Sequence, residues 1–587
     1  RHAPPAKSAG RVQSPSLRII CERETERDKH IKEEYWPISS KFAFKDFTFE
    51  AELIKSNESD LKKTPVSSED QKNKIQSELK SSEFYIHSIE TKPQSSSPNP
   101  PFRTSTLQMT ASSSLGFTAD RTMRSAQNLY EAGLITYLRT DGINISTSPN
   151  TGEPFSEENP GPPPLEEIRN VISEKFGKNF LSDDVRVYKS KVKNSQEAHE
   201  AIRPTNIKTY PEKINLGQDE HKLYTLIWNR TVASQMSNSE HERKKIVVHS
   251  EHDKFVLNAS SRKTIFEGFE TLSKKDSSEA LDFPEDLKEK EKVNFLEFIS
   301  EQKFTSPPNR YSEASLIKKM EELGIGRPST YASTVKGLRD KKYAYGAKSI
   351  APSDLGRVLN SYLCGVYKEF FIETKFTADL ESELDNIAEG NISWTEVLDK
   401  FWKELQNYLS KKIDGIPLND SDNFKTRQVL DLLNEELDEV IFPRNEEGNI
   451  IRDCPKCSSQ TSLKKGKFGY FVGCSECKWT KKPFDFSTSW ETYRELPKEL
   501  GQHPDLNKPI FADMSINGPC VWTIRDDKKI FGSPDEDEHI LDIGLNRAVE
   551  LIERDSGENI LFIEENSGIP IFLKNGRFGE YTEFDGF

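Results

Sequence analysis

The order of apolar and polar positions divides the chain into regions of different periodicity. Residues 35–53 alternate between the two kinds, as in KFAFKDFTF over Lys41–Phe49, which predicts strand. Helical spacing starts near Pro15 and dominates residues 104–236 and 311–409, whereas residues 244–304 return to strands and charged loops. The pattern predicts a multidomain α+β protein in which helical regions flank β-rich ones.

Polar segments separate these regions. Residues 55–82 are rich in Lys and Ser and are expected to form a solvated insertion, residues 95–101 a Ser/Pro linker, and residues 148–164 a Pro/Gly-rich loop. Residues 499–587 contain two weakly similar units, with LNKPI at Leu506–Ile510 and SGIPI at Ser567–Ile571. Each stretch is followed by glycines, so we expect two small β-containing repeats.

Length and charge leave several protein classes open. A chain of 587 residues is too long for one core and should hold several domains. No apolar run approaches the roughly 20 residues that span a bilayer, so no membrane partner is expected. The net charge of -14 does not exclude nucleic acid, because basic side chains can gather on one surface. The compartment stays open: cytoplasm or nucleoid in a bacterium, or an organelle in a eukaryote.

Four of the seven cysteines fall in one short window. They form two CxxC pairs, at a spacing that suits a structural Zn²⁺ ribbon in a reducing compartment: Cys454, Cys457, Cys474 and Cys477. All four ligand positions are filled by protein, so this zinc would not be catalytic. Lysines and aromatic residues at 464–471 suit single-strand binding by stacking and phosphate contact.

Candidate chemistry lies around Tyr137. A helix is expected to begin at Thr118 and to end at Gly133, followed by a short strand at residues 134–138. In an extended segment Tyr137, Arg139 and Asp141 point to the same side. A phenol with a pKa of about 10 needs nearby charge to act as a nucleophile, and a guanidinium can neutralise a phosphate. The alternative is a buried strand tyrosine beside an Arg–Asp surface pair.

The residues around Tyr137 favour a catalytic tyrosine over a buried structural one. LYEAGLITYLRTD over residues 129–141 resembles the active-site segment of bacterial-type topoisomerase I, a type IA DNA topoisomerase. The resemblance implies that Tyr137 forms a 5′-phosphotyrosine and that Arg139 contacts the scissile phosphate, with Asp141 orienting the guanidinium. Gly142 stands where the family usually has Ser, which loosens the turn but removes no catalytic group.

Further segments match the family in the family's order. They are SAGRVQSP at residues 8–15, PFRTSTLQ at 101–108 with Arg103 in place of a Thr, QEAHEAIRPT at 196–205, and a long run from Arg310 to Tyr331. In that run Ser312 can cap a helix that ends at Gly324, and Pro328 and Ser329 start a second helix. Their apolar faces include Leu316, Met320, Val335 and Leu338. Within these segments, the resemblance favours His199 as a phosphate or proton-relay group near Tyr137. The DNA-binding candidates are Ser8, Arg11, Gln13, Arg203, Arg327, Ser329 and Thr330.

The resemblance implies a toroidal body with helical, winged-helix-like domains and a β-arch, followed by a zinc ribbon and small β repeats. The single-strand-groove domain would start with residues 1–40 and continue with a helical part at 305–430. The β-arch would consist of residues 41–100, which include the polar insertion, and 241–304. The active-site tyrosine would lie in the domain at 101–240. The zinc ribbon would cover 445–485 and the C-terminal topoisomerase repeats 490–587.

The expected function is ATP-independent relaxation of negative supercoils by a monomer acting on single-stranded and negatively supercoiled DNA. No Walker-type phosphate loop is present in the sequence, in agreement with ATP independence. Family members hold Mg²⁺ in an N-terminal Toprim domain ahead of the SAGRVQ segment, so its ligands are expected to lie outside this sequence, which starts at Arg1 and reads as a fragment.

Two other functions remain open at this point. The chain could be a catalytically incomplete fragment that only binds single-stranded DNA. It could instead be another tyrosine-dependent strand transferase, such as a recombinase, but the Arg-His-Arg constellation expected of one is not found in the sequence.

Overall fold

The computed structural model falls into two units, which are described separately. The larger unit comprises residues 8–356 and 369–403, and the smaller one residues 1–7, 357–368 and 404–587. The residues described are 8–57, 59–149, 161–189, 200–273, 282–367, 372–409, 412–413, 416–417, 426–443, 449–466, 469–484, 490–515, 518–525, 527–535, 538–555, 559–563, 570–576 and 579–584.

Helices in the larger unit enclose an apolar core next to the tyrosine segment. They are α3 (Thr104–Leu115), α4 (Ala119–Glu131), α5 (Pro164–Lys175) and α6 (Gln218–Ala233). Tyr224 and Trp228 of α6 are buried among Leu129, Ile135 and Leu138. Thr118 caps α4 by accepting a hydrogen bond from the backbone N–H of Arg121, and Gly133 follows that helix at φ 69°. Both helix boundaries were predicted from the sequence.

The β-rich part of the larger unit is an antiparallel sheet that closes on itself. Its order is β2-β8-β5-β6-β7-β3-β4, and β3 also pairs with β2. The strands are β2 (Ile38–Phe44), β3 (Phe47–Ser56), β4 (Ser59–Asp60), β5 (Phe84–Ser96), β6 (Ser239–Ser250), β7 (Phe255–Phe266) and β8 (Lys292–Ser300). Phe42, Phe49 and Phe84 fill the interior. Closure removes the open sheet edges between β2 and β3.

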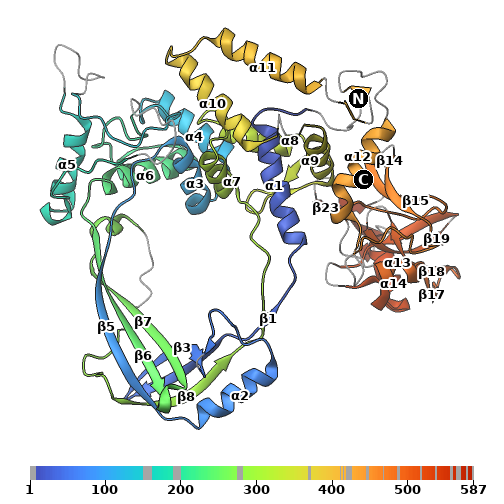
Figure 1. Cartoon of the computed structure of the whole chain (residues 1–587), viewed down its shortest axis with the longest axis horizontal. Coiled ribbons are helices and arrows are strands. Elements are labelled where there is room, and N and C mark those ends of the chain that lie inside the picture. Colours follow the sequence, from blue (N-terminus) through green and yellow to red (C-terminus); the bar gives the residue numbers. More distant parts are fainter. Residues whose placement is uncertain are drawn as a thin grey trace. The chain divides into compact units, whose positions relative to one another are not determined.

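Two sets of strands connect the sheet to the helices. Strands β5 and β6 stay paired as far as Ser96 and Ser239, close to the start of α3 and the end of α6. On the other side, β1 (Glu34–Tyr35) pairs with β9 (Lys303–Phe304) between α1 (Gln13–Asp28) and α7 (Glu313–Glu322). The ribbon of this unit therefore passes around an open centre (Figure 1).

Helices α7 and α8 (Tyr331–Asp340) precede a hairpin of β10 (Ala344–Tyr345) and β11 (Ala351–Pro352), which is a winged-helix-like arrangement. Ser312 caps α7 as predicted, and Gly324 follows it at φ 72°. The apolar residues Leu316, Met320, Val335 and Leu338 are buried as their helical spacing predicted. Farther along lie α9 (Asp354–Tyr367), α10 (Thr374–Ala388) and α11 (Trp394–Leu409).

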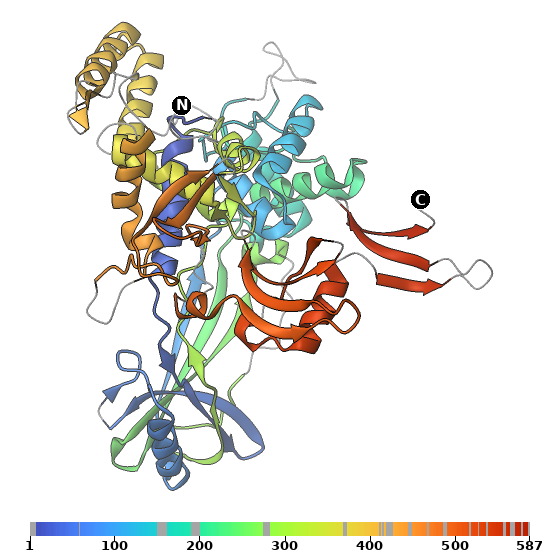
Figure 2. The same cartoon turned by 90° about the vertical axis from the view of Figure 1, so that its right-hand side faces the viewer.

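The smaller unit contains separate small sheets (Figure 2). Helix α12 (Thr426–Ile441) shares a core with β14 (Thr461–Gly466) and β15 (Gly469–Cys474), and β16 (Thr480–Lys481) completes that sheet. Helix α13 (Trp490–Glu495) precedes a sheet of β17 (Lys498–Gln502), β18 (Pro509–Ser515), β19 (Gly518–Arg525) and β20 (Lys528–Gly532), on which α14 (Leu545–Asp555) packs. The last strands are β21 (Asn559–Ile563), β22 (Pro570–Gly576) and β23 (Gly579–Phe584).

The predicted repeats at the C-terminus correspond to matching hairpins. The β18–β19 turn pairs Ser515 with Gly518, and the β22–β23 turn pairs Gly576 with Gly579. These findings confirm the α+β fold class. One expectation is wrong: residues 55–82 are not simply a solvated insertion. They contain α2 (Glu69–Lys80), whose Ile75 and Leu79 are buried in the core of the sheet. The prediction failed because only those few apolar residues mark the buried face.

Candidate active site and zinc centre

Tyr137 lies on an irregular segment and not on a strand. The strand predicted at residues 134–138 is reduced to an isolated bridge between Ile135 and Pro204. The side chains nevertheless alternate: Leu138 and Thr140 are buried, Tyr137 and Arg139 are exposed, and Asp141 is half-buried. The predicted grouping of Tyr137, Arg139 and Asp141 on the solvent side is therefore observed, and the alternative of a buried strand tyrosine is wrong.

Tyr137 is 54% exposed, and one of its contacts in the described structure is with another aromatic ring. Its neighbour is Tyr130 of α4, whose ring meets it edge-on with centroids 5.5 Å apart. Among the residues that the structure describes, the guanidinium of Arg139 takes part in no hydrogen bond or ion pair. A phenol and a free guanidinium thus stand on the same exposed face, where a phosphate can reach both.

The first residue of α3, Thr104, forms hydrogen bonds with the backbone of this segment. The Thr104 hydroxyl donates to the carbonyl oxygen of Leu138 at 2.7 Å, with the carbonyl of Thr140 at 3.0 Å, and accepts from the Thr140 N–H at 2.9 Å. The backbone N–H of Thr104 also donates to the Thr140 carbonyl at 3.0 Å. Because Thr104 is fully buried, this exchange fixes the backbone on both sides of Arg139.

Residues 200–205 hold the segment from the other side. The backbone N–H of Thr136 donates to the carbonyl of Arg203 at 2.9 Å, and the Thr136 hydroxyl donates to the carbonyl of Ala201 at 2.8 Å. The Thr205 N–H donates to the carbonyl of Leu134 at 3.0 Å. Three segments that lie far apart in the sequence therefore meet at the candidate nucleophile: 102–104, 134–140 and 200–205.

The Arg203 side chain is buried, and its guanidinium forms hydrogen bonds within the protein. Its guanidinium donates to both carboxylate oxygens of Glu200, at 2.7 and 3.1 Å, and to the carbonyl of Pro204 at 2.8 Å. Glu200 in turn accepts from the backbone N–H of Ser146 at 2.8 Å. Arg203 would have to leave these partners to reach a phosphate, so this geometry favours a positioning role. His199 lies outside the described residues, and its predicted role stays a prediction.

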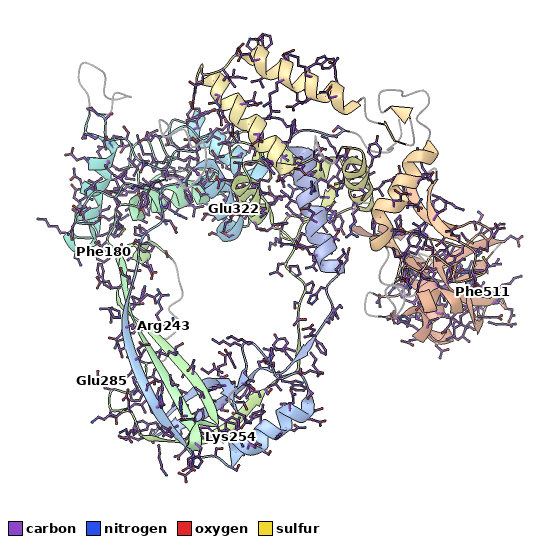
Figure 3. All side chains as sticks on the ribbon, viewed as in Figure 1. Phe180, Arg243, Lys254, Glu285, Glu322 and Phe511 are labelled. Atoms are coloured by element: carbon purple, nitrogen blue, oxygen red, sulfur yellow. The ribbon has the colours of Figure 1, made fainter. Side chains whose placement is uncertain are left out.

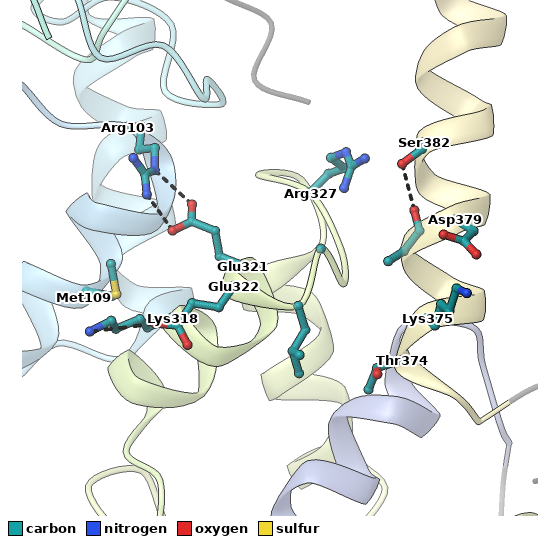
Figure 4. Close-up of a pocket in the computed structure, with 13 residues that line it drawn as sticks. Arg103, Met109, Lys318, Glu321, Glu322, Arg327, Thr374, Lys375, Asp379 and Ser382 are labelled. Carbon is teal, nitrogen blue, oxygen red and sulfur yellow. Dashed lines mark hydrogen bonds and ion pairs between the residues drawn. The ribbon is translucent and has the colours of Figure 1, made fainter. Parts of the chain in front are cut away.

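A cleft of about 720 Å³ opens next to the tyrosine segment, between α3, α7 and α10 (Figure 4). Arg103 forms a two-pronged ion pair with Glu321 on one wall, at 2.9 and 2.6 Å. Arg327, Lys375 and Asp379 line the facing side. Arg103 and Thr104 are adjacent, so the cleft adjoins the residue that holds the backbone around Arg139.

The predicted DNA-binding residues at 8–13 and 327–330 lie close together. Buried Glu381 lies 3.1 Å from the Arg11 guanidinium and 3.9 Å from that of Arg327. Arg327 also donates to Asp385 at 2.6 Å. Burial opposes the charged form of Arg327, yet the hydrogen bond and charge of Asp385 raise the pKa of the guanidinium above its ordinary value. Both arginine side chains are partly exposed.

The other predicted contacts surround this pair. Gln13 donates to the Ser8 carbonyl at 3.1 Å and accepts from Lys341. Ser329 is exposed in the turn before α8, and the Thr330 hydroxyl accepts from the Arg327 N–H at 2.8 Å. Helix α8 begins at Tyr331, slightly later than predicted. Sequence reasoning missed Glu381, whose role is visible only when Arg11 and Arg327 are brought together.

The four predicted zinc ligands converge. The Sγ atoms of Cys454 and Cys477 are 3.6 Å apart, and those of Cys457 and Cys474 are 3.4 Å apart. A tetrahedral site with Zn–S bonds of about 2.3 Å needs sulfurs roughly 3.8 Å apart. Within the cluster, the backbone N–H of Cys477 leads the contributions that lower the pKa of the Cys474 thiol to about 6, whereas burial raises the pKa of the Cys454 thiol to about 12. Zinc binding would itself favour the thiolate form of all four. The residues therefore fit a structural zinc ion.

The described residues do not offer a comparable site for Mg²⁺. Their close groupings of His, Cys, Asp or Glu are the four cysteines and a set of His87, His249 and Asp253, neither of which is the carboxylate cluster that Mg²⁺ prefers. In the acidic run at 535–538, the described carboxylates pair with arginines. Asp535 contacts Arg547 and Arg554, and Glu538 contacts Arg547.

Comparison with known proteins agrees with this geometry. A family model described as DNA topoisomerase matches residues 2–399. DNA topoisomerase 1 of Rickettsia felis is 37% identical and aligns with 100% of this chain and 75% of its own length. The enzyme of that name from Xylella fastidiosa is 33% identical, over 98% of this chain and 69% of its own. Full-length topoisomerase I from Thermotoga maritima superimposes with a TM-score of 0.62, at 32% identity, over 81% of this chain and 70% of that one.

The fold and these matches together define a type IA DNA topoisomerase, an isomerase that acts on DNA. Within that class, the chain belongs to the bacterial DNA topoisomerase I family. No helix in the described part of the chain is both long and apolar enough to cross a membrane.

Proposed function

We propose that the chain relaxes negatively supercoiled DNA by cutting one strand at Tyr137, passing the other strand and resealing the cut, without ATP. The observation that carries this proposal is that Tyr137 and Arg139 share one exposed face of a backbone that Thr104 and residues 201–205 hold by hydrogen bonds. Family membership supports the reaction class. We propose that the chain acts as a monomer.

In the proposed cleavage step, the phenolic oxygen of Tyr137 attacks a phosphorus atom of single-stranded DNA. The bond from phosphorus to the 3′-oxygen breaks, and the phenol's proton is transferred so that the 3′-oxygen leaves as a hydroxyl. The product is a 5′-phosphotyrosine, which conserves the energy of the phosphodiester. Attack by the 3′-hydroxyl reverses the step, so no nucleotide is consumed.

Arg139 would donate to the non-bridging oxygens of the attacked phosphate and stabilise the charge that develops there. Asp141 would orient the guanidinium. His199 is proposed as a proton relay or phosphate contact, because imidazole can serve both roles near neutral pH. These assignments rest on the family motifs and on the shared exposed face of Tyr137 and Arg139.

We propose that the single strand lies across the surface formed by the predicted DNA-binding residues Ser8, Arg11, Gln13, Arg203, Arg327, Ser329 and Thr330. The charged pair Arg11 and Arg327 supports this course, since both reach Glu381. Arg203 would shape this surface through the backbone that it positions and not by contacting a phosphate, because its hydrogen bonds are already used within the protein. The division of the chain into the seven segments given in the sequence analysis belongs to the same proposal.

The zinc ribbon is proposed as an additional single-strand contact. A zinc ion held by the four cysteines would fix the CxxC turns, while Tyr470, Phe471 and the lysines of β14 would contact bases and phosphates. Zinc takes no part in cleavage here. Mg²⁺ remains a family expectation, and no step is assigned to it because the described residues do not form its site.

Relaxation of negatively supercoiled plasmid tests the proposal. The chain should relax the plasmid with Mg²⁺ present, Tyr137→Phe should lose at least about four orders of magnitude in rate, and Tyr130→Phe should keep the activity. Tyr130→Phe is a matched control because it removes the nearest exposed phenol but keeps the ring that packs against Tyr137. Binding of single-stranded DNA without relaxation would instead support a DNA-binding module, which the missing Mg²⁺ cluster among the described residues favours.

A further inference from the structure

Three potential metal ligands meet on the outer face of the closed sheet. His87 comes from β5, His249 from β6, and Asp253 from the turn between β6 and β7. One ligand atom from each lies within 4.8 Å of the others. Lys254, labelled in Figure 3, directly follows Asp253 and forms an ion pair with Glu78 of α2 at 3.0 Å, so this group lies at the end of the sheet beside α2.

A β-bulge brings the two histidines together. Ile86 pairs with Val248 and Ser88 with Val247, which leaves His87 as the extra residue on β5. Its ring stacks on that of His249, with centroids 3.8 Å apart and planes 5° apart. This stack keeps one nitrogen of each ring within 4.8 Å of a carboxylate oxygen of Asp253.

The turn that supplies Asp253 has an unusual backbone. His252 and Asp253 both have positive φ, at 59° and 54°, although neither is glycine. This left-handed pair is unfavourable unless contacts maintain it. Asp253 Oδ1 accepts from His249 Nδ1 at 2.6 Å and from the Tyr85 hydroxyl at 3.1 Å, and these contacts hold the carboxylate against the imidazoles.

The three side chains offer two imidazoles and one carboxylate. A carboxylate held beside imidazoles is a ligand set suited to zinc and its neighbours among the transition metals, and not to Mg²⁺.

We propose that His87, His249 and Asp253 form a second metal site, which takes a divalent cation of the zinc, nickel and copper class. On binding, the two imidazoles would turn out of their parallel stack so that one nitrogen of each ring and one oxygen of Asp253 reach the cation, and water completes its coordination. The cation would link β5, β6 and the β6–β7 turn, and so stabilise this end of the sheet. This site is separate from the tyrosine segment and does not depend on the proposed cleavage.

Calorimetric titration of the untagged full chain with Zn²⁺ tests this site, after the cysteine site has been filled and excess metal removed. We expect one additional equivalent to bind. His87→Ala and His249→Gln should each weaken this binding at least about ten-fold, because even altering an outer partner of a metal ligand has that effect. His252→Asn is the matched control, since it changes a neighbouring histidine of the same turn, and should leave the affinity unchanged.

The unfolding midpoint gives a second measurement. Without added metal, His87→Ala should unfold at the temperature of the parent chain, because His87 is exposed and the hydrogen bonds of Asp253 are to His249 and Tyr85. Excess Zn²⁺ should raise the midpoint of the parent and of His252→Asn but not of His87→Ala. The proposal would be overturned if the parent chain bound no additional equivalent, if His87→Ala and His249→Gln kept the parent's affinity, or if His252→Asn lost as much affinity as they do.

Discussion

The Thr104 hydroxyl donates a 2.7 Å hydrogen bond to the backbone carbonyl of Leu138, the residue directly after Tyr137. Thr104 is the first residue of α3, so the position of that helix sets the position of the candidate nucleophile. Thr104→Val keeps the shape of the side chain but leaves the Thr140 N–H without this acceptor. We expect a loss of about 1–3 kcal/mol in stability and slower DNA cleavage, measured by thermal unfolding and single-turnover cleavage.

Thr104→Ser separates this hydrogen bond from the effect of packing. Serine restores the hydroxyl and removes only a methyl group, so it should recover most of the cleavage rate. Equal rates for Thr104→Val and the parent chain would show that the hydroxyl does not position Tyr137.

Arg203 should act through stability and not through a phosphate contact. Arg203→Met leaves the Glu200 carboxylate without the two hydrogen bonds it accepts from the guanidinium, and we expect about 1–3 kcal/mol of destabilisation. The salt dependence of single-strand affinity should be unchanged, because no phosphate contact is lost. A weaker salt dependence with unaltered stability would instead restore Arg203 as a phosphate ligand.

Arg11 and Arg327 should behave in the opposite way. Each is partly exposed and charged beside Glu381, so Arg11→Gln and Arg327→Gln should weaken single-strand binding uniformly across sequences. Each lost phosphate contact should reduce the slope of log affinity against log salt by about 0.7. Arg121→Gln is a matched control, because Arg121 is an exposed arginine paired with Asp219, and should leave the slope as it is. Unchanged slopes for Arg11→Gln and Arg327→Gln would contradict the assignment.

Removal of zinc should unfold the ribbon without unfolding the larger unit. Leu463 and Val472 of the ribbon share a core with Leu433 and Leu437 of α12, so α12 should loosen as well. Cys457→Ser should abolish zinc binding by this ribbon and expose residues 426–484 to protease, since apparent zinc-binding energies of about 10–16 kcal/mol are folding energy. Cys364→Ala, which changes a cysteine outside the ribbon, should keep its zinc. Protection from protease in zinc-free Cys457→Ser would contradict this.

Local signals in the sequence were sufficient for the helix boundaries and the zinc ligands. Thr118, Gly133 and Ser312 act within one helical turn, and the CxxC pairs carry their own spacing, so short-range chemistry fixes these features. The prediction of a strand at residues 134–138 was wrong because contacts with distant segments determine the backbone course there. The apolar pattern of this segment is real, but bonds from Thr104 and residues 201–205 hold it in an irregular course.

Contacts between distant segments could not be predicted from one sequence. Glu381 joins Arg11 to Arg327, and a bulge places His87 on His249; neither arrangement has a short-range signature. The family resemblance predicted which segments belong to the site but not how they are held. Arg103, noted only as a departure from the family pattern, proves to anchor α3 to Glu321 of α7.

The most direct test of the central claim is the identity of the residue that becomes linked to DNA. Single-stranded DNA incubated with the full chain and rapidly denatured should yield a protein–DNA adduct, and digestion followed by mass spectrometry should place a 5′-phosphate on Tyr137. Tyr137→Phe should form no adduct and still bind the strand. Attachment at another residue, or an adduct that persists in Tyr137→Phe, would contradict the account.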